Sequence, residues 1–272
     1  MPSAETLTSD SRFTGLFVGP KHSGKTVAAA SFPKPMEIED FDGRIRGLLG
    51  AQFLDRKGIS YEFYTPRGIG AESPISKVNT KLEGWLTASR VGQFALSSVV
   101  IDSLTAECYA MLVQSIGLTH TSAKNATKDN PKSGKFIGPL AMSGPEDYGF
   151  EAQATYDILS CLRSLPLKAM IATAHIVDRF GKIDPDNPFS ESVVVGKKLS
   201  LRDKIGQNIG IYFDHIFEFD RRMEGGHERF FVSFRSSVAC TSYAELPEGE
   251  FDITGKNFYD FMNSFLKKET PV

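Results

Sequence analysis

Short apolar runs alternate along this chain with longer segments in which apolar residues recur at helical spacing. Such short runs are typical of buried strands, and the longer segments are typical of amphipathic helices. The predicted strands lie at residues 13–18, 36–39, 60–65, 97–102 and 168–175. The predicted helices lie at residues 27–32, 75–91, 105–116 and 146–162. Strands that alternate with helices predict an α/β fold, with a mainly parallel sheet flanked by helices.

The C-terminal part of the pattern is different, because two predicted strands follow one another directly. Residues 215–220 and 228–234 are rich in aromatic and apolar side chains, and they flank Glu224-Gly225-Gly226. Glycines between two such runs are typical of a β-hairpin turn. A last helix is predicted over residues 256–266. We therefore expect a C-terminal antiparallel hairpin beside the parallel sheet.

Two polar segments interrupt the alternation of strands and helices. Residues 119–145 are rich in Lys, Gly, Ser and Pro, and residues 177–198 contain spaced Gly and Pro. Long segments of this kind inside a compact domain are usually functional or mobile, so we expect two mobile loops. A length of 272 residues suits one large domain. We expect a tail over residues 1–12 and a single domain over residues 13–272.

A phosphate-binding motif follows the first predicted strand. Residues 19–26 read GPKHSGKT, a full match to G-x-x-x-x-G-K-[ST] between a strand and a helix. Its glycines let backbone N–H groups surround a polyphosphate, and the helix N-terminus adds the positive end of a dipole. Lys25 is expected to reach the β- and γ-phosphates of ATP, and Thr26 to ligate Mg²⁺. The predicted nucleotide-binding residues are Gly19, Lys21, Ser23, Gly24, Lys25 and Thr26.

Asp102 ends the apolar strand predicted over residues 97–102. In a P-loop protein, a carboxylate in this place lies beside the magnesium ion held by the motif's hydroxyl. We therefore predict that Asp102 and Thr26 bind Mg²⁺ together. The alternative is that Asp102 only caps the helix that follows it.

Hydrolysis also needs a group that orients or deprotonates water. Residue 103 is a serine, so no second acid follows Asp102, and the base must come from another strand end. Asp42 is the first choice, with Asp40 and Glu39 as runners-up, because all three lie at the carboxyl end of the strand over residues 36–39. A solvated acidic turn is the alternative.

His175 ends the strand predicted over residues 168–175, at the same edge of the sheet. A polar side chain there can bond the γ-phosphate and transmit its presence to the next segment. The alternative is a histidine whose ring is satisfied by backbone groups.

Four lysines in the first polar segment form the predicted nucleic-acid contact. They are Lys124, Lys128, Lys132 and Lys135. Lysines of this kind contact the phosphates of single-stranded DNA, although the segment lacks aromatic residues before Phe136 for stacking on bases. The overall net charge of −2 argues against a protein that coats nucleic acid by bulk charge. An ordinary surface loop remains the alternative.

The composition places further limits on the class of protein. No apolar run is long enough to span a bilayer, and the first residues lack the basic and apolar regions of a signal peptide. The three cysteines are far apart and show no metal-binding spacing. We therefore expect reduced thiols, no membrane partner and a place in the cytoplasm, that of the host cell if the gene belongs to a phage.

The ordered set GPKHSGKT, SFPKP, DFDG, SSVVIDSLT and IATAH over residues 13–220 resembles the phage nucleotide-binding ATPases of the RecA-like superfamily. These include the phage single-strand annealing proteins of the fourth Sak group. The resemblance implies a RecA-like ATPase core that acts on single-stranded DNA in phage recombination or replication, assembles as a ring or filament, and meets a phage or host single-strand binding protein.

By position, the resemblance makes Lys25 and Thr26 the phosphate and magnesium residues and Asp102 the Walker B acid. Asp42 stands where the family has a catalytic Glu or Asp, and His175 stands where RecA has a Gln. The resemblance also puts a basic group that completes a neighbour's site near residues 197–204, where Lys197, Lys198, Arg202 and Lys204 lie.

Two other classes of protein fit the same motif. One is a P-loop switch or assembly factor that binds nucleotide with little hydrolysis and no DNA. The other is a small-molecule or nucleotide kinase, which the lack of an arginine-rich lid disfavours.

Overall fold

The computed structural model describes most of the chain. The described residues are 12–64, 74–122, 136–137, 140–141, 145–183, 191–235 and 246–266. Lys124, Lys128, Lys132 and Lys135 lie outside them. The predicted contact between these lysines and DNA therefore stays a prediction.

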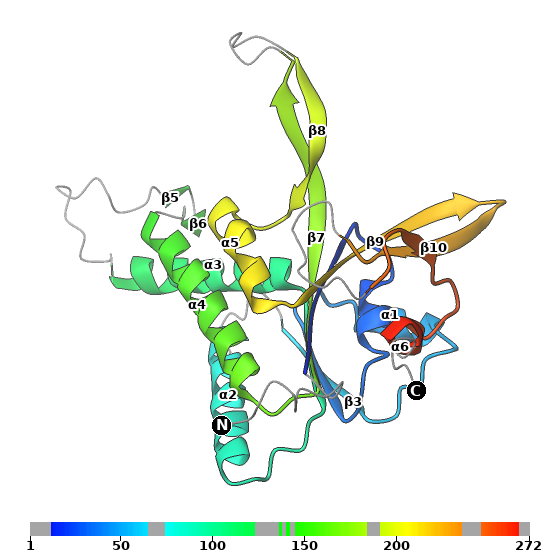
Figure 1. Ribbon diagram of the computed structural model, residues 1–272. Helices are drawn as coiled ribbons and strands as arrows, with labels where there is room; N and C mark the ends of the chain where they lie inside the picture. Colours follow the sequence, from blue (N-terminus) through cyan, green and yellow to red (C-terminus); the bar gives the residue numbers. More distant parts are fainter. Residues whose placement is uncertain are drawn as a thin grey trace, which may run out of the picture.

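Within the described residues, nine strands form one sheet (Figure 1). Along the sheet the strands are β11 (Glu250–Asp252), β10 (His227–Ser233), β9 (His215–Glu224), β1 (Phe13–Gly19), β7 (Ala169–Lys182), β4 (Ser98–Asp102), β2 (Met36–Asp40) and β3 (Ile59–Phe63). The six strands from β9 to β3 are parallel, whereas β10 and β11 are antiparallel to their neighbours. The ninth strand, β8 (Ser192–Leu199), pairs only with β7.

Helices cover both faces of the sheet, and the alternation of side chains along each strand explains why. Leu16 and Val18 of β1 pack on one side, with the core under α2 (Pro74–Arg90), α3 (Leu104–Ser122) and α4 (Pro145–Ser164). Phe17 packs on the other side, with α1 (Lys25–Ala29), the 3₁₀ helix η2 (Ile45–Gly50) and α6 (Phe258–Leu266). Because both faces are covered, β4 is buried over its whole length.

The predicted fold class is confirmed. The structure has a P-loop core, with a mainly parallel sheet between two helical layers and a C-terminal antiparallel hairpin. The hairpin turns at Gly225 and Gly226, which have φ angles of 60° and 82° as its tight turn requires. Elements too short for a pattern were not predicted. They include η2, β11, α5 (Asp203–Asn208) and the 3₁₀ helix η4 (Ile209–Tyr212).

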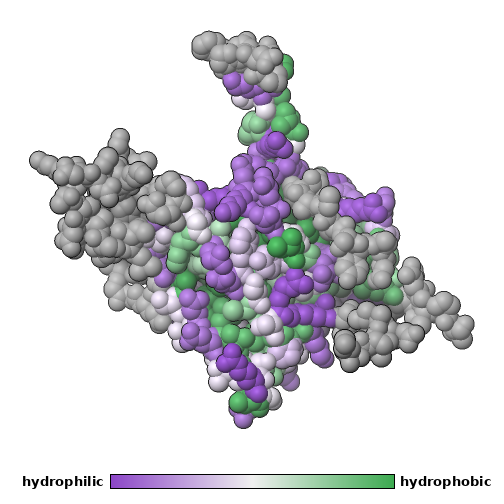
Figure 2. Space-filling view, turned by 60° about the vertical axis from the view of Figure 1, so that its left-hand side comes forward, coloured by the Kyte–Doolittle hydropathy of each residue, from purple (hydrophilic) through white to green (hydrophobic). Residues whose placement is uncertain are grey.

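The prediction of a loop over residues 177–198 is wrong. Strand β7 continues past the sheet to Lys182, and β8 returns beside it in antiparallel pairing, with an irregularity between Arg179 and Phe180. We call residues 176–183 and 191–199 the arm, because Figure 1 shows them projecting from the body of the structure. Apolar side chains are exposed on the arm, and Phe180 and Val194 are 64% and 55% exposed. Figure 2 shows apolar patches between polar ones along the projection.

The predicted loop over residues 119–145 is shorter than expected. Helix α3 continues to Ser122, and α4 begins at Pro145. Between them, β5 (Phe136–Ile137) and β6 (Leu140–Ala141) form a small antiparallel ribbon. Among the described residues, no helix is long and apolar enough to cross a bilayer.

Candidate functional site

The P-loop needs glycine at two places because other chain segments pass close to it. A Cβ atom on Gly19 would lie 2.3 Å from the backbone oxygen of Phe219 in β9. Gly24 caps α1 with a φ angle of 88°, and a Cβ atom there would lie 3.2 Å from the ring of Phe230 in β10. The sequence G-x-x-x-x-G-K-T therefore allows a turn that fits under the C-terminal hairpin.

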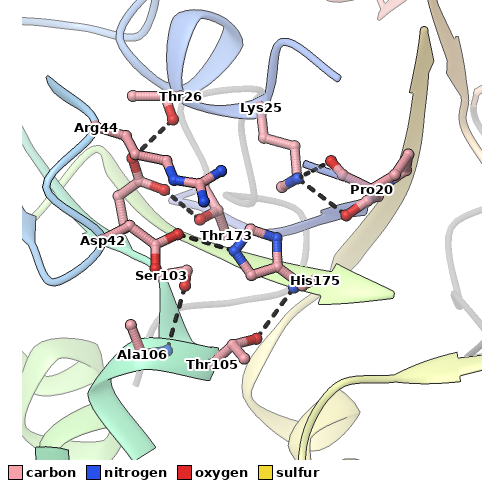
Figure 3. A network of polar contacts seen from close by, with 12 residues as sticks. Pro20, Lys25, Thr26, Asp42, Arg44, Ser103, Thr105, Ala106, Thr173 and His175 are labelled. Atoms are coloured by element: carbon pink, nitrogen blue, oxygen red, sulfur yellow. Dashed lines mark hydrogen bonds and ion pairs between the residues drawn. The ribbon is translucent and has the colours of Figure 1, made fainter. Parts of the chain in front are cut away.

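Lys25 is folded against the loop that carries it. Its Nζ atom donates hydrogen bonds to the carbonyl oxygens of Gly19 and Pro20, at 3.0 and 2.7 Å (Figure 3). Burial lowers the pKa of Lys25 to about 8, although the nearby charges of Asp102 and Asp42 favour the protonated form. The ammonium group is thus held at the mouth of the P-loop, where the phosphates of a nucleotide bind in such loops.

Asp102 ends β4, and β7 lies between β4 and β1 in the sheet. The Asp102 carboxylate still reaches the P-loop that follows β1. The Thr26 hydroxyl donates a hydrogen bond to its Oδ2 atom at 2.7 Å, and the Thr173 hydroxyl of β7 donates to Oδ1. Burial raises the pKa of Asp102, and the two hydroxyl donors oppose this shift. Asp102 does not cap the next helix. Ser103 does so, since its hydroxyl accepts a hydrogen bond from Ala106 N at 3.3 Å.

The three candidate bases occupy different places. Glu39 is on the α2 side of the sheet, where it bonds Lys81 at 3.0 Å and accepts a hydrogen bond from Tyr64. Asp40 is buried and accepts hydrogen bonds from the backbone N–H groups of Arg44 and Ile45, at 3.1 and 3.0 Å. Only Asp42 among the three lines the cleft beside the P-loop.

Asp42 and His175 are joined across the site. The Asp42 Oδ2 and His175 Nε2 atoms are 2.9 Å apart, and the backbone N–H of His175 donates to Thr105 Oγ1 at 3.1 Å (Figure 3). Burial raises the pKa of Asp42, but the hydrogen bond and charge of His175 and the charge of Arg44 outweigh it, so the net pKa is lowered. Asp42 is therefore ionised at neutral pH. Among the described residues, no group bonds the buried Nδ1 atom of His175.

A cleft of about 480 Å³ extends from these residues toward the C-terminal hairpin. A volume of this size is typical of small-molecule sites. The P-loop, Asp42, Asp102 and His175 supply the polar lining of this cleft, and Phe53, Phe230 and Ile253 supply apolar surface. The predicted ligand Lys21 is exposed and is not among the lining residues.

Sequence reasoning missed three residues of the site. Thr173 was detectable, because side chains alternate along a strand and residues 173 and 175 must share a face of β7. Arg44 and Phe230 carried no signal of their own, since their places depend on the turn after β2 and on the hairpin.

The site suits a magnesium ion that arrives with a nucleotide. A hydroxyl and a carboxylate, from Thr26 and Asp102, are oxygen ligands that Mg²⁺ accepts. Within the described part of the chain, no group of three or more His, Cys, Asp and Glu side chains could hold a metal by itself. Since Mg²⁺ usually binds through one or two carboxylates plus substrate phosphates, this sparse set fits it.

Neither a protein-family model nor a curated protein matches the chain. A KaiC-like protein from the archaeon Pyrococcus horikoshii OT3 has a similar structure, with 12% identity and a TM-score of 0.46, over 88% of this chain and 84% of that chain. The flagellar accessory protein FlaH from Methanocaldococcus jannaschii has 10% identity and a TM-score of 0.42, over 90% of this chain and 87% of that chain. Likeness at this level carries no conclusion about activity.

The lowered pKa of Lys25 predicts a proton uptake on ATP binding. Phosphates favour the charged lysine, so binding raises a pKa that is about 8 in the free protein. Above about pH 8, binding must therefore add a proton, and the affinity for ATP falls as pH rises. Calorimetry at about pH 9, in two buffers of different ionisation enthalpy, measures this uptake.

The exposed Lys21 provides the control, since Lys21→Ala is expected to keep the uptake. Lys25→Arg is expected to lose it, because arginine stays charged at this pH. A Lys25→Arg variant that still binds ATP with the same proton uptake as the parent would show that another group titrates.

Proposed function

We propose that this chain is an Mg²⁺-dependent ATPase that acts on single-stranded DNA in phage recombination or replication, as an annealing or strand-exchange type of protein. One observation carries the ATPase part. The Asp102 carboxylate accepts a hydrogen bond from the Thr26 hydroxyl beneath the P-loop. Asp42 and His175, which are hydrogen-bonded to each other, line the same cleft.

Each residue has a distinct role in this proposal. Lys25 and the P-loop backbone bind the β- and γ-phosphates of ATP, with Ser23 buried in the loop and bonded to Pro20 O at 2.9 Å. Thr26 and Asp102 hold Mg²⁺. When bound, the ion neutralises charge on the β- and γ-phosphate oxygens.

Asp42 positions the attacking water and accepts a proton from it. Because the pKa of Asp42 is lowered, its carboxylate is ionised and ready to accept a hydrogen bond from water. His175 fixes the orientation of this carboxylate through Nε2, and its unpartnered Nδ1 is the atom that we assign to a bond with the γ-phosphate.

The DNA part rests on the sequence of residues 119–145 and on the composition of the arm. The arm has Phe180 exposed next to Arg179, and exposed aromatic and basic side chains together are typical of single-strand binding. One chain offers few phosphate contacts, so a ring or filament would have to multiply them.

The second candidate is a P-loop switch or assembly factor that does not bind DNA. It is favoured because basic side chains after the arm, and at its end, already contact acidic side chains of the same chain. Lys197 pairs with Glu218 at 3.1 Å, Lys198 contacts Asp203 at 3.5 Å, and Arg202 pairs with Glu151. These lysines and Arg202 are therefore poor candidates for a group that completes the site of a neighbour.

The ATPase proposal predicts that Asp42→Asn retains ATP but hydrolyses it slowly. Loss of a positioned base lowers turnover by about 100-fold or more, whereas affinity should change little because Asp42 does not hold the phosphates. Phosphate release under saturating ATP and Mg²⁺ and a separate binding titration measure the two effects. Asp260→Asn, exposed on α6, is the control. Turnover of Asp42→Asn within about twofold of the parent, against the loss of about 100-fold or more expected for a catalytic base, would remove Asp42 from the mechanism.

The DNA proposal predicts that single-stranded DNA binds in the presence of ATP and Mg²⁺ and stimulates hydrolysis. Replacement of Lys124, Lys128, Lys132 and Lys135 by Ala should abolish the stimulation and leave basal hydrolysis intact. Titrations at two salt concentrations measure this, since phosphate contacts weaken with salt. A parent chain that hydrolyses ATP but binds no DNA would favour the switch or assembly role.

A further inference from the structure

Arg44 lines the cleft from the turn between β2 and η2. Figure 3 shows its guanidinium extending across the site, with Lys25 on one side and the Asp42–His175 pair on the other. The charge of Arg44 acts on residues on both sides: it opposes protonation of Lys25 and favours ionisation of Asp42. Arg44 thus brings a second cation to the mouth of the P-loop.

The backbone holds Arg44 in this place. Gly43 has a φ angle of 68°, and a Cβ atom there would lie 2.9 Å from the ring of Phe63, so the turn requires glycine. The Asp40 carboxylate accepts hydrogen bonds from the backbone N–H groups of Arg44 and Ile45.

The preceding part of the turn is tied to the end of β4. The N–H groups of Phe41 and Asp42 both donate to the carbonyl oxygen of Asp102, at 2.7 and 3.2 Å. The turn that carries Arg44 is therefore anchored on the residue that we assign to the magnesium ion.

The guanidinium has no anionic partner in the described part of the chain. No Asp or Glu side chain described forms an ion pair with Arg44, whereas Arg202, Arg222 and Arg229 each have one. An arginine presents five N–H donors in a rigid plane, which matches carboxylate and phosphate oxygens. At the mouth of a P-loop, the matching anion is the phosphate chain of a nucleotide.

We infer that Arg44 is an arginine finger that acts in cis, on the nucleotide bound by its own chain. This role rests on the proposed ATPase function and adds to it. Water attacks the γ-phosphorus, the bond from that phosphorus to the β–γ bridging oxygen breaks, and ADP leaves with the electron pair. The water proton passes to Asp42 and then to solvent. Arg44 stabilises the negative charge on the phosphoryl oxygens during this transfer.

Action in cis makes hydrolysis independent of assembly. Lys25, Thr26, Asp42, Asp102 and Arg44 all belong to one chain and line one cleft. Hydrolysis would then need no basic residue from a neighbouring subunit. The activity per chain should stay constant when the protein is diluted, even where assembly is lost.

The first test compares Arg44→Ala with Arg46→Ala, an exposed arginine two positions later, in the 3₁₀ helix η2 that follows Arg44. Arg44→Ala should lower kcat by about 1,000-fold, the lower end of the range for arginine fingers, with a change in ADP affinity that is small by comparison. It should also lose the tight complex with ADP and aluminium fluoride, which imitates the transferring phosphoryl group. Arg44→Lys should restore part of the activity, and Arg46→Ala should behave as the parent does.

The second test separates action in cis from action in trans. Arg44→Ala is mixed with Lys25→Ala, which cannot hydrolyse ATP but retains Arg44. If Arg44 acts in cis, the mixture stays inactive at every ratio. Recovery of activity on mixing would place Arg44 in the site of a neighbour and overturn the inference.

Turnover of the parent chain, measured first, separates this inference from the proposed function. A parent that binds ATP without turnover contradicts both the ATPase proposal and the finger role. A parent with turnover and an Arg44→Ala variant that is equally active overturns the Arg44 assignment alone. A merely structural role for Arg44 would change thermal stability and leave aluminium fluoride binding unaffected in the folded protein, which also contradicts the inference.

Discussion

The buried carboxylate of Asp102 connects the parts of the site. It accepts hydroxyl hydrogen bonds from Thr26, after β1, and from Thr173, in β7, while its own backbone oxygen holds the turn after β2. A carboxylate without such donors would be costly to bury. The three strands β1, β7 and β4 must therefore keep their order and register for the charge to be tolerated, and the same contacts place the P-loop beside the acidic turn.

The elements that the sequence predicts well are those determined by local pattern. The buried strand β4 and the P-loop of residues 19–26 are examples. A strand buried on both faces requires a continuous apolar run, and a phosphate-binding turn requires glycines and a lysine at fixed spacing. The choice among Glu39, Asp40 and Asp42 was less certain. Glu39 and Asp40 point to opposite faces of β2. Asp40 is used by the backbone N–H groups of Arg44 and Ile45, and Asp42 alone of the three lines the cleft.

The arm shows where local pattern was insufficient. Its glycines and polar residues indicated a loop, yet Val193, Val194 and Val195 are β-branched residues typical of a strand. The two strands of the arm pair with each other past the carboxyl end of the parallel strands. Neither face of the arm is buried there, so no alternation of apolar and polar residues is required. Arg44 was missed for a similar reason, since its role depends on a turn fixed by distant backbone groups.

One continuous strand joins the cleft to the arm. Thr173 contacts Asp102, His175 contacts Asp42, and β7 then continues without a break to Lys182. The partners of the residues assigned to the metal and to the attacking water thus lie on the same strand as half of the exposed arm. In this account, any effect of the γ-phosphate on the arm would pass through His175.

The central claim is that Asp102 and Thr26 form the place where Mg²⁺ meets the nucleotide. The most direct test is a titration of ATP binding with and without Mg²⁺, for the parent and for Asp102→Asn. The parent should bind ATP at least about tenfold more tightly with the ion, a gain of about 1.4 kcal/mol. Asp102→Asn should bind with the same affinity in both conditions. An Asp102→Asn variant that keeps the full gain from Mg²⁺ would contradict the account.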